Sequence, residues 1–168
     1  MKAVWVAGAT VLALAVQTTI GRYVGGTLAI DLVLVVVVYT ALTSGPVTGL
    51  LVGTLAGLVQ DSLSIEVIGI GGLAKTIVGF LAGVIGTQFI VAQAPSRFVV
   101  FFSATVLHAV VFMGLYELLG LRDFGRPYTA VLEQALGNAL VGIVAFQLAE
   151  LLPGAVERGR LTRPKHRR

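Results

Sequence analysis

The sequence predicts an all-helical membrane protein with six transmembrane helices, and three observations lead to this prediction. Hydrophobic residues make up 57% of the 168, and the 21 glycines raise the apolar share to about 70%, against about 45–50% in soluble domains. Charged residues make up only 12%, against about 25%. The apolar residues fall into six runs near the length that spans a bilayer. A soluble enzyme, a disordered chain and a collagen-like chain are therefore excluded.

The first two predicted helices cover residues 3–20 and 28–43. The first resembles the core of a signal peptide, but its apolar run is long and no small-x-small cleavage site follows, so a retained helix is favoured. In the second, every residue from Leu32 to Val38 is Leu or Val. Such residues favour strands in water, but an isolated strand leaves its backbone groups without partners in lipid. The segment is therefore predicted to be helical.

The third and fourth predicted helices are separated by short turns. The tripeptide Ser-Gly-Pro at 44–46 forms the first turn, and Pro46 suits the start of a helix because its missing N–H has no partner there in any case. The third helix is predicted over residues 46–63. A short loop containing Glu66 leads to the fourth, over residues 69–92.

The last two predicted helices cover residues 98–119 and 128–152, with a polar loop between them. A Pro-Gly pair at 153–154 is expected to end the sixth helix. The absence of cysteine excludes disulfides and thiolate sites. The chain therefore divides into one six-helix transmembrane domain, residues 1–153, and a basic cytoplasmic tail, residues 154–168.

Basic residues predict a bacterial cytoplasmic membrane protein with both termini in the cytoplasm. An even number of spans puts the termini on one side, and that side carries eight Lys and Arg residues against three on the other. The tail is expected to act as a topology signal, or else to lie on the anionic inner leaflet or to bind an acidic partner. Nucleic-acid binding is not expected, because no aromatic residues accompany the charges. The eight are Lys2, Arg97, Arg158, Arg160, Arg163, Lys165, Arg167 and Arg168, and the three are Arg22, Arg122 and Arg126.

Most polar residues of the predicted spans fall in their outer halves. Each is a candidate site, because charged side chains inside a membrane are costly. For Asp31 and Glu117, which lie near predicted helix ends, an equal alternative is that the side chain reaches the headgroups. His108 and Asn138 are deeper, and His108 is interpreted as a bundle-facing histidine. The outer-half candidates for an ion pair or polar cluster are Asp31, Gln60, Asp61, Lys75, Glu117 and Glu133.

Glycines at intervals of four form ridges on the third and fourth predicted helices. One ridge ends on Asp61 and the other includes Lys75. Small residues let helices approach closely, either within the bundle or against a partner. The short loop makes the two helices antiparallel neighbours, so Asp61 and Lys75 are expected to form an ion pair, structural rather than part of a proton relay. The ridge glycines are Gly49, Gly53, Gly57, Gly71, Gly79 and Gly83.

No pattern typical of catalysis or metal binding is present. The chain lacks a paired-histidine spacing, a G-x-S-x-G motif and a phosphate loop. A protein without enzymatic activity, cofactor or metal is therefore predicted.

Four motifs resemble those of the MreD family of rod shape-determining membrane proteins. They are the segment Ala-Ile-Asp-Leu-Val-Leu at 29–34, the glycine ridge ending in Gln-Asp at 49–61, Gly-x-Gly-Gly-Leu-Ala-Lys-Thr at 69–76, and Gly-x3-Gly at 79–83. The resemblance rests on the order and spacing of these motifs, and the rest of the chain resembles the family only in hydropathy and length. It implies that Asp31, Gln60, Asp61 and Lys75 are site residues.

The resemblance implies a scaffold role in bacterial cell elongation. Such a protein acts with MreC, which has a single span, in an assembly that includes the MreB filament, a glycan polymerase and a penicillin-binding transpeptidase. The family is also similar to the six-helix substrate-binding subunits of energy-coupling-factor vitamin transporters. That similarity implies an S-component-like bundle and leaves a second hypothesis open, a membrane subunit that binds a small molecule.

Overall fold

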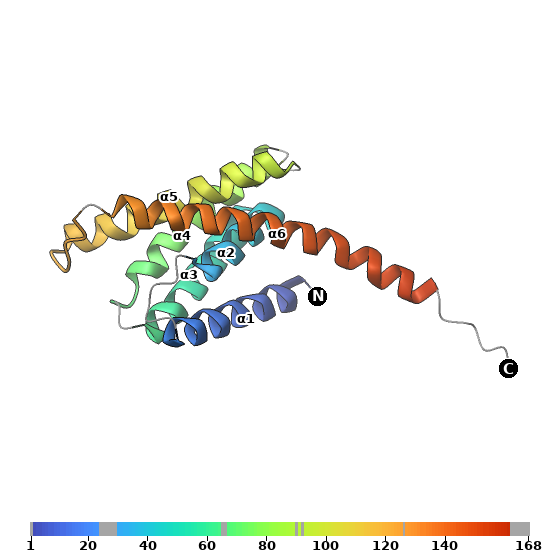
Figure 1. The fold of residues 1–168 in the computed structure, drawn as a ribbon, viewed down its shortest axis with the longest axis horizontal. Coiled ribbons are helices and arrows are strands. Elements are labelled where there is room, and N and C mark those ends of the chain that lie inside the picture. Colours follow the sequence, from blue (N-terminus) through green and yellow to red (C-terminus); the bar gives the residue numbers. More distant parts are fainter. Residues whose placement is uncertain are drawn as a thin grey trace.

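A computed structural model of the protein consists of six α-helices joined by short connections (Figure 1). It describes residues 2–23, 30–64, 67–89, 91, 93–125 and 127–161, and no strand occurs among them. The prediction of an all-helical chain with six helices is therefore confirmed. The helices are α1 (Lys2–Tyr23), α2 (Leu32–Ser44), α3 (Pro46–Leu63), α4 (Ile70–Gln88), α5 (Ala94–Leu118) and α6 (Tyr128–Leu161).

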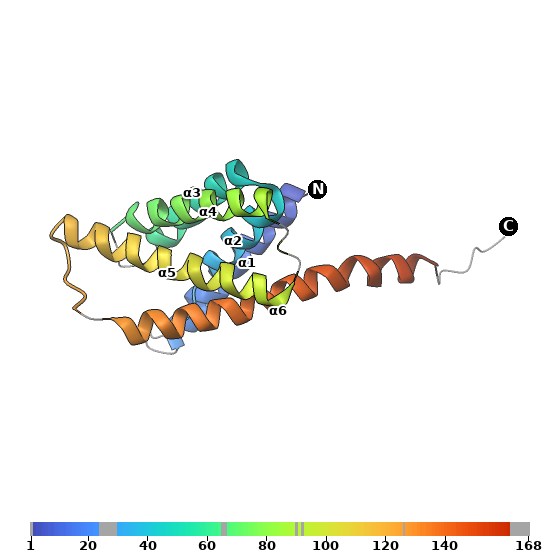
Figure 2. The same cartoon turned by 90° about the horizontal axis from the view of Figure 1, so that it is seen from above.

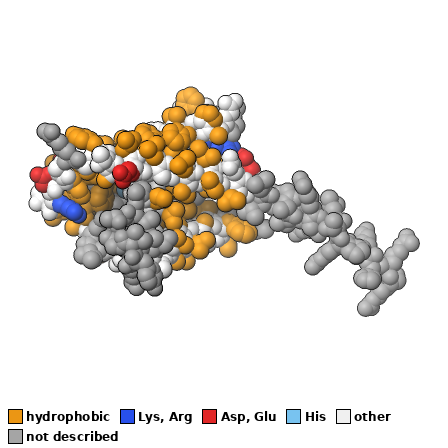
Figure 3. Space-filling view, in the orientation of Figure 1, with side chains coloured by type: hydrophobic (Ala, Val, Ile, Leu, Met, Phe, Trp, Pro, Cys, Tyr) orange, Lys and Arg blue, Asp and Glu red, His pale blue; other side chains and the backbone are white. Residues whose placement is uncertain are grey.

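The length and composition of the helices are those of a membrane protein. Three helical segments are long and apolar enough to cross a bilayer, namely Ile70–Gln88, Ala94–Leu118 and Tyr128–Glu150. The shorter helices Val4–Thr19 and Leu32–Ser44 are also apolar. Hydrophobic side chains cover most of the described surface in Figure 3, and the few charged ones gather mainly toward its two ends. Such a surface suits a hydrocarbon environment better than water.

Four predicted helix boundaries are wrong. α2 begins at Leu32 rather than at 28, and α4 ends at Gln88 rather than at 92. α6 does not end at 152 but continues through the Pro-Gly pair to Leu161, since an interior proline removes one backbone hydrogen bond without always ending a helix. α5 begins at Ala94 rather than at 98, because Pro95 occupies its first turn. Of the predicted tail, residues 154–161 thus belong to α6, and residues 162–168 lie outside the described part.

α2 is the central helix and packs against each of the other five (Figures 1 and 2). Its run of Leu and Val fills the core: Val33, Leu34, Val37 and Val38 are almost completely buried. With 13 residues, α2 is about 20 Å long, shorter than a hydrocarbon core of about 30 Å. Its neighbours therefore extend beyond it and surround its first turn.

The two glycine ridges meet in the interface between α3 and α4, which are antiparallel neighbours. A Cβ atom at Gly53 would overlap the carbonyl oxygen of Lys75, and one at Gly49 would overlap that of Gly79. A Cβ at Gly57 would lie 2.5 Å from the Cα atom of Gly72. Backbones this close leave no room for a side chain. The ridges therefore serve packing inside the bundle and are not open to a partner.

Replacement of Gly53 by alanine is expected to destabilise the protein. The added methyl group must push α3 and α4 apart, a change that costs about 1–3 kcal/mol and lowers the melting temperature by about 2–4 °C per kcal/mol in a chain of this size. Gly114→Ala in α5 is the matched control, because nothing lies within 4 Å of its Cβ position. Thermal unfolding of the detergent-solubilised variants measures the difference. Equal melting temperatures would contradict the close packing.

Candidate functional site

Asp31 links the start of α2 to α4. It is the N-cap of α2, and its Oδ1 accepts a hydrogen bond from the backbone N–H of Leu34 at 3.0 Å. Its Oδ2 lies 2.9 Å from Nζ of Lys75. Both side chains are buried, with relative exposures of 6% and 3%. The carboxylate therefore caps one helix and neutralises the lysine of another.

His108 on α5 is the second partner of the Lys75 ammonium. Its Nε2 lies 3.2 Å from Nζ of Lys75, and the imidazole is buried. A lysine ammonium can only donate hydrogen bonds. Nε2 must then be the unprotonated nitrogen of a neutral imidazole with its proton on Nδ1. Lys75 is thus held between one anionic and one neutral acceptor, so the three side chains together carry no net charge.

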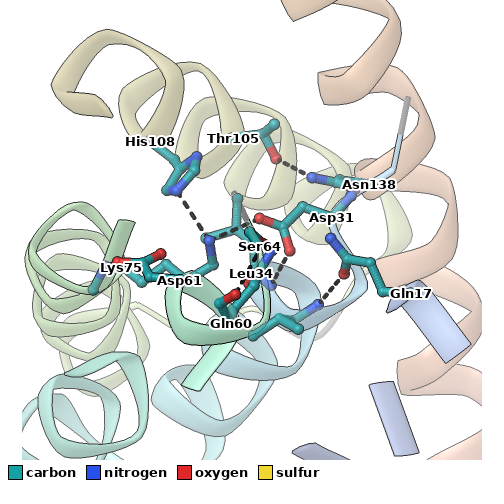
Figure 4. A network of polar contacts seen from close by, with 12 residues as sticks. Gln17, Asp31, Leu34, Gln60, Asp61, Ser64, Lys75, Thr105, His108 and Asn138 are labelled. Atoms are coloured by element: carbon teal, nitrogen blue, oxygen red, sulfur yellow. Dashed lines mark hydrogen bonds and ion pairs between the residues drawn. The ribbon is translucent and has the colours of Figure 1, made fainter. Parts of the chain in front are cut away.

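Amide and hydroxyl groups from α5 and from two further helices, α1 and α6, complete the cluster (Figure 4). The backbone N–H of Asp31 donates to Oδ1 of Asn138 on α6 at 2.8 Å, and Nδ2 of Asn138 donates to Oγ1 of Thr105 on α5 at 3.1 Å. Oε1 of Gln17 on α1 accepts from the backbone N–H of Val33 at 3.3 Å. Two of these contacts satisfy the N–H groups of Asp31 and Val33 at the start of α2, where a helix has no partner of its own for them.

The cluster lies deep in the bundle. His108 and Asn138 are each ten residues from the helix end at the α5–α6 loop, a distance of about 15 Å at 1.5 Å per residue. That depth is about half of a hydrocarbon core. The alternative that Asp31 reaches the headgroups is therefore wrong: α2 begins within the bundle, and its capping carboxylate is buried there.

The predicted pairing of Asp61 with Lys75 is also wrong. Oδ2 of Asp61 accepts hydrogen bonds from the backbone N–H groups of Gly69 at 2.8 Å and Gly72 at 3.0 Å. Asp61 thus caps the start of α4, where the helix dipole favours an anion. Gly71 is needed beside it, because a Cβ atom there would overlap Oδ1 of Asp61. The carboxylate has its partners at the start of α4, and Lys75 points to α2 and α5 instead.

The other candidates from the sequence lie outside the cluster. Glu117 and Glu133 are exposed, and the Oε1 atom of Gln60 is buried with no hydrogen-bond partner among the described residues. Sequence reasoning placed Asn138 among the deep polar residues without giving it a role, and it left Thr105 out. The spacing of three between Thr105 and His108 is the available signal, since it puts both side chains on one face of a helix.

Arg97 and Glu150 form a second ion pair at the end of the bundle opposite the α5–α6 loop. Nη2 of Arg97 pairs with Oε1 of Glu150, and its Nε donates to the carbonyl oxygen of Val91 at 3.3 Å. The guanidinium also lies over the ring of Phe146, 4.5 Å from the ring centre, a favourable arrangement for a cation. These contacts join the start of α5 to α6 where the apolar part of α6 ends.

The buried cluster is built to hold helices together. Its donors and acceptors occupy one another, and no group of three or more His, Asp or Glu side chains in the described part of the chain could hold a metal ion. Helices α1, α2, α4, α5 and α6 each contribute a side chain. Each contact stabilises the bundle only while the others are present, since a buried polar group without a partner is costly.

Double-mutant cycles are expected to distinguish the partners of Lys75. Asp31→Asn and Lys75→Met should each destabilise the protein by about 3–5 kcal/mol, because each leaves a buried charge uncompensated, and the double variant should recover part of the loss. Asp61→Asn, the control, should be additive with Lys75→Met. Unfolding of the purified proteins in detergent measures the coupling energies. A coupling for Asp61 as large as that for Asp31 would contradict the observed pairing.

Comparison with known families identifies this bundle. No curated protein and no solved structure matched the chain. The model of one family, rod shape-determining protein MreD, matches residues 1–152. That match takes in all six helices up to the end of the apolar part of α6. The chain therefore belongs to the MreD family and is a rod-shape membrane protein.

Proposed function

We propose that this protein is a non-enzymatic scaffold of the bacterial cell-elongation complex. In this proposal it binds MreC within the cytoplasmic membrane and helps to position the peptidoglycan synthases that maintain cell shape. The family match over residues 1–152 carries the proposal. MreB, a glycan polymerase and a penicillin-binding transpeptidase are the further members of the assembly.

The distribution of apolar side chains supports a role in binding other helices. Large hydrophobic side chains are exposed on every helix except the central α2, among them Trp5, Leu55, Phe80, Val110 and Leu140. Such surfaces suit lipid or the spanning helix of a partner. Because the glycine ridges are used between α3 and α4, a partner must bind to one of these outward faces.

Six spans with both termini in the cytoplasm are the topology we propose. The start of α1 and the end of α6 lie toward the same end of the bundle (Figure 1), as an even number of spans requires. The shortness of α2 is compatible with this topology, because α2 packs against all five other helices and seven of its 13 residues are buried in protein.

A small-molecule-binding subunit of a vitamin-type transporter is the alternative function. The convergence of polar side chains from five helices at mid-depth is the observation in its favour. The mutual hydrogen bonds of those side chains argue against it, since a ligand would have to displace Lys75 from Asp31 and His108. Thermal-shift screening of the purified protein tests this alternative, which predicts a ligand-induced rise in melting temperature.

Affinity purification from native membranes tests the scaffold function. MreC is expected among the co-purifying proteins, together with cell-wall synthases, after mild detergent extraction. An unrelated six-span protein carrying the same tag, expressed at the same level, is the control. Recovery of paired ATPase subunits without MreC would support the transporter alternative and contradict the scaffold.

A further inference from the structure

Glu133 carries an outward-facing charge on α6. It is the sixth residue of its helix, and Lys75 is the sixth residue of α4. Lys75 is buried and paired, whereas Glu133 is exposed and forms no ion pair with any residue in the described part of the chain. Five residues correspond to about 7.5 Å along the helix. A charge at this depth facing lipid is costly, so it marks a functional site rather than an ordinary surface position.

Glu133 lies on a stripe of exposed side chains, the outer α6 stripe, made up of Glu133, Leu136, Leu140, Val144 and Gln147. Their spacing of three and four puts them on one face of the helix, and all five are exposed. In the part of the chain that the structure describes, α6 packs against α5 and α2 and against no other helix. In Figure 3, which shows the side of the bundle with α6 in front, hydrophobic side chains cover much of the surface. The stripe is therefore open along its length.

Polar groups stand at the two ends of this stripe and apolar groups between them. Glu133 and Gln147 are 14 residues apart, about 21 Å, and Leu136, Leu140 and Val144 between them are 42%, 61% and 51% exposed. The outward face of α3 differs, since its Val47, Leu51, Leu55 and Leu58 are all apolar. These four α3 side chains offer a partner helix no polar group. The outer α6 stripe suits another helix that has an apolar middle and polar groups near its ends.

We propose that the outer α6 stripe binds a single spanning helix that carries a basic side chain at the level of Glu133. This inference rests on the proposed function, in which that helix belongs to MreC. A cation from the partner would neutralise Glu133 where the solvent is apolar, and the leucines would pack against its apolar middle. A second copy of this chain does not fit, because a two-fold axis along the membrane normal would place Glu133 opposite Glu133 at equal depth.

Crosslinking and charge variants in cells test the proposal. A photo-reactive residue at Leu140 is expected to crosslink to MreC, whereas one at Leu51 on α3, the matched control, is not. Glu133→Lys should reduce recovery of MreC at least tenfold and Glu133→Gln should reduce it less. Replacing the basic residue of the partner by Glu should restore recovery with Glu133→Lys. The melting temperature of both variants should equal that of the unaltered protein, since Glu133 has no ion-pair partner among the described residues of the bundle.

Several outcomes would overturn the proposal. They are crosslinks from Leu140 only to lipid or to a second copy, and unchanged recovery of MreC with Glu133→Lys. Loss of recovery with Arg126→Gln equal to that with Glu133→Gln would also overturn it, because Glu133 would then serve a residue of its own chain; Arg126 lies outside the described residues. Recovery of MreC by the unaltered protein separates the two hypotheses. If the unaltered protein does not recover MreC, the proposed function is contradicted. If it recovers MreC and one of the outcomes above occurs, only binding at the outer α6 stripe is contradicted.

Discussion

The burial of one lysine ammonium is the constraint on which the rest of the structure depends. Lys75 lies in the middle of an apolar bundle with 3% exposure, and a charge in that position is tolerated only beside an anion and further acceptors. Asp31 and His108 supply them. To bring Asp31 to that depth, α2 must begin inside the bundle. The N–H groups at this helix start have no partner within the helix, and the side chains of Gln17 and Asn138 accept hydrogen bonds from them.

The close approach of α3 and α4 serves the same end. Gly53 packs directly against the backbone of Lys75, so that side of α4 is filled by α3 and the lysine side chain is directed to α2 and α5. Asp61 fixes the start of α4 through two backbone N–H groups. The glycine ridge and the capping aspartate thus determine the position from which Lys75 reaches its partners. Asp61 and the ridge glycines therefore support the position of Lys75, although Asp31 alone of the two aspartates is paired with it.

The interior and the exterior of the bundle differ in the contacts that they can make. The polar side chains inside the bundle are occupied by one another, and the glycines are occupied by the opposing helix. The outward faces, where apolar side chains dominate and charge is scarce, are therefore the surfaces on which we propose that partner helices bind. This member of a rod-shape family thus combines a closely packed, hydrogen-bonded interior with a mainly apolar exterior.

The sequence by itself determined the membrane class, the number of helices, the antiparallel pairing of α3 with α4 and the residues that matter in the first half of the chain. Composition, apolar run length and the spacing of glycines are local properties, and local properties can be read along the chain. The partner of Lys75 could not be read in this way. Asp61 and Asp31 are both plausible anions at similar predicted depth, and the choice depends on where each carboxylate finds backbone donors.

Only the tertiary structure decided that choice. Gly69 just before α4 and Gly72 in its first turn each offer a backbone N–H to Asp61, so that carboxylate is satisfied without the lysine. The late start of α2 inside the bundle, the roles of Asn138 and Thr105, and the outward position of Glu133 likewise depend on how five helices turn about α2. Those rotations are set by packing between segments up to 107 residues apart, and no short stretch of sequence encodes them.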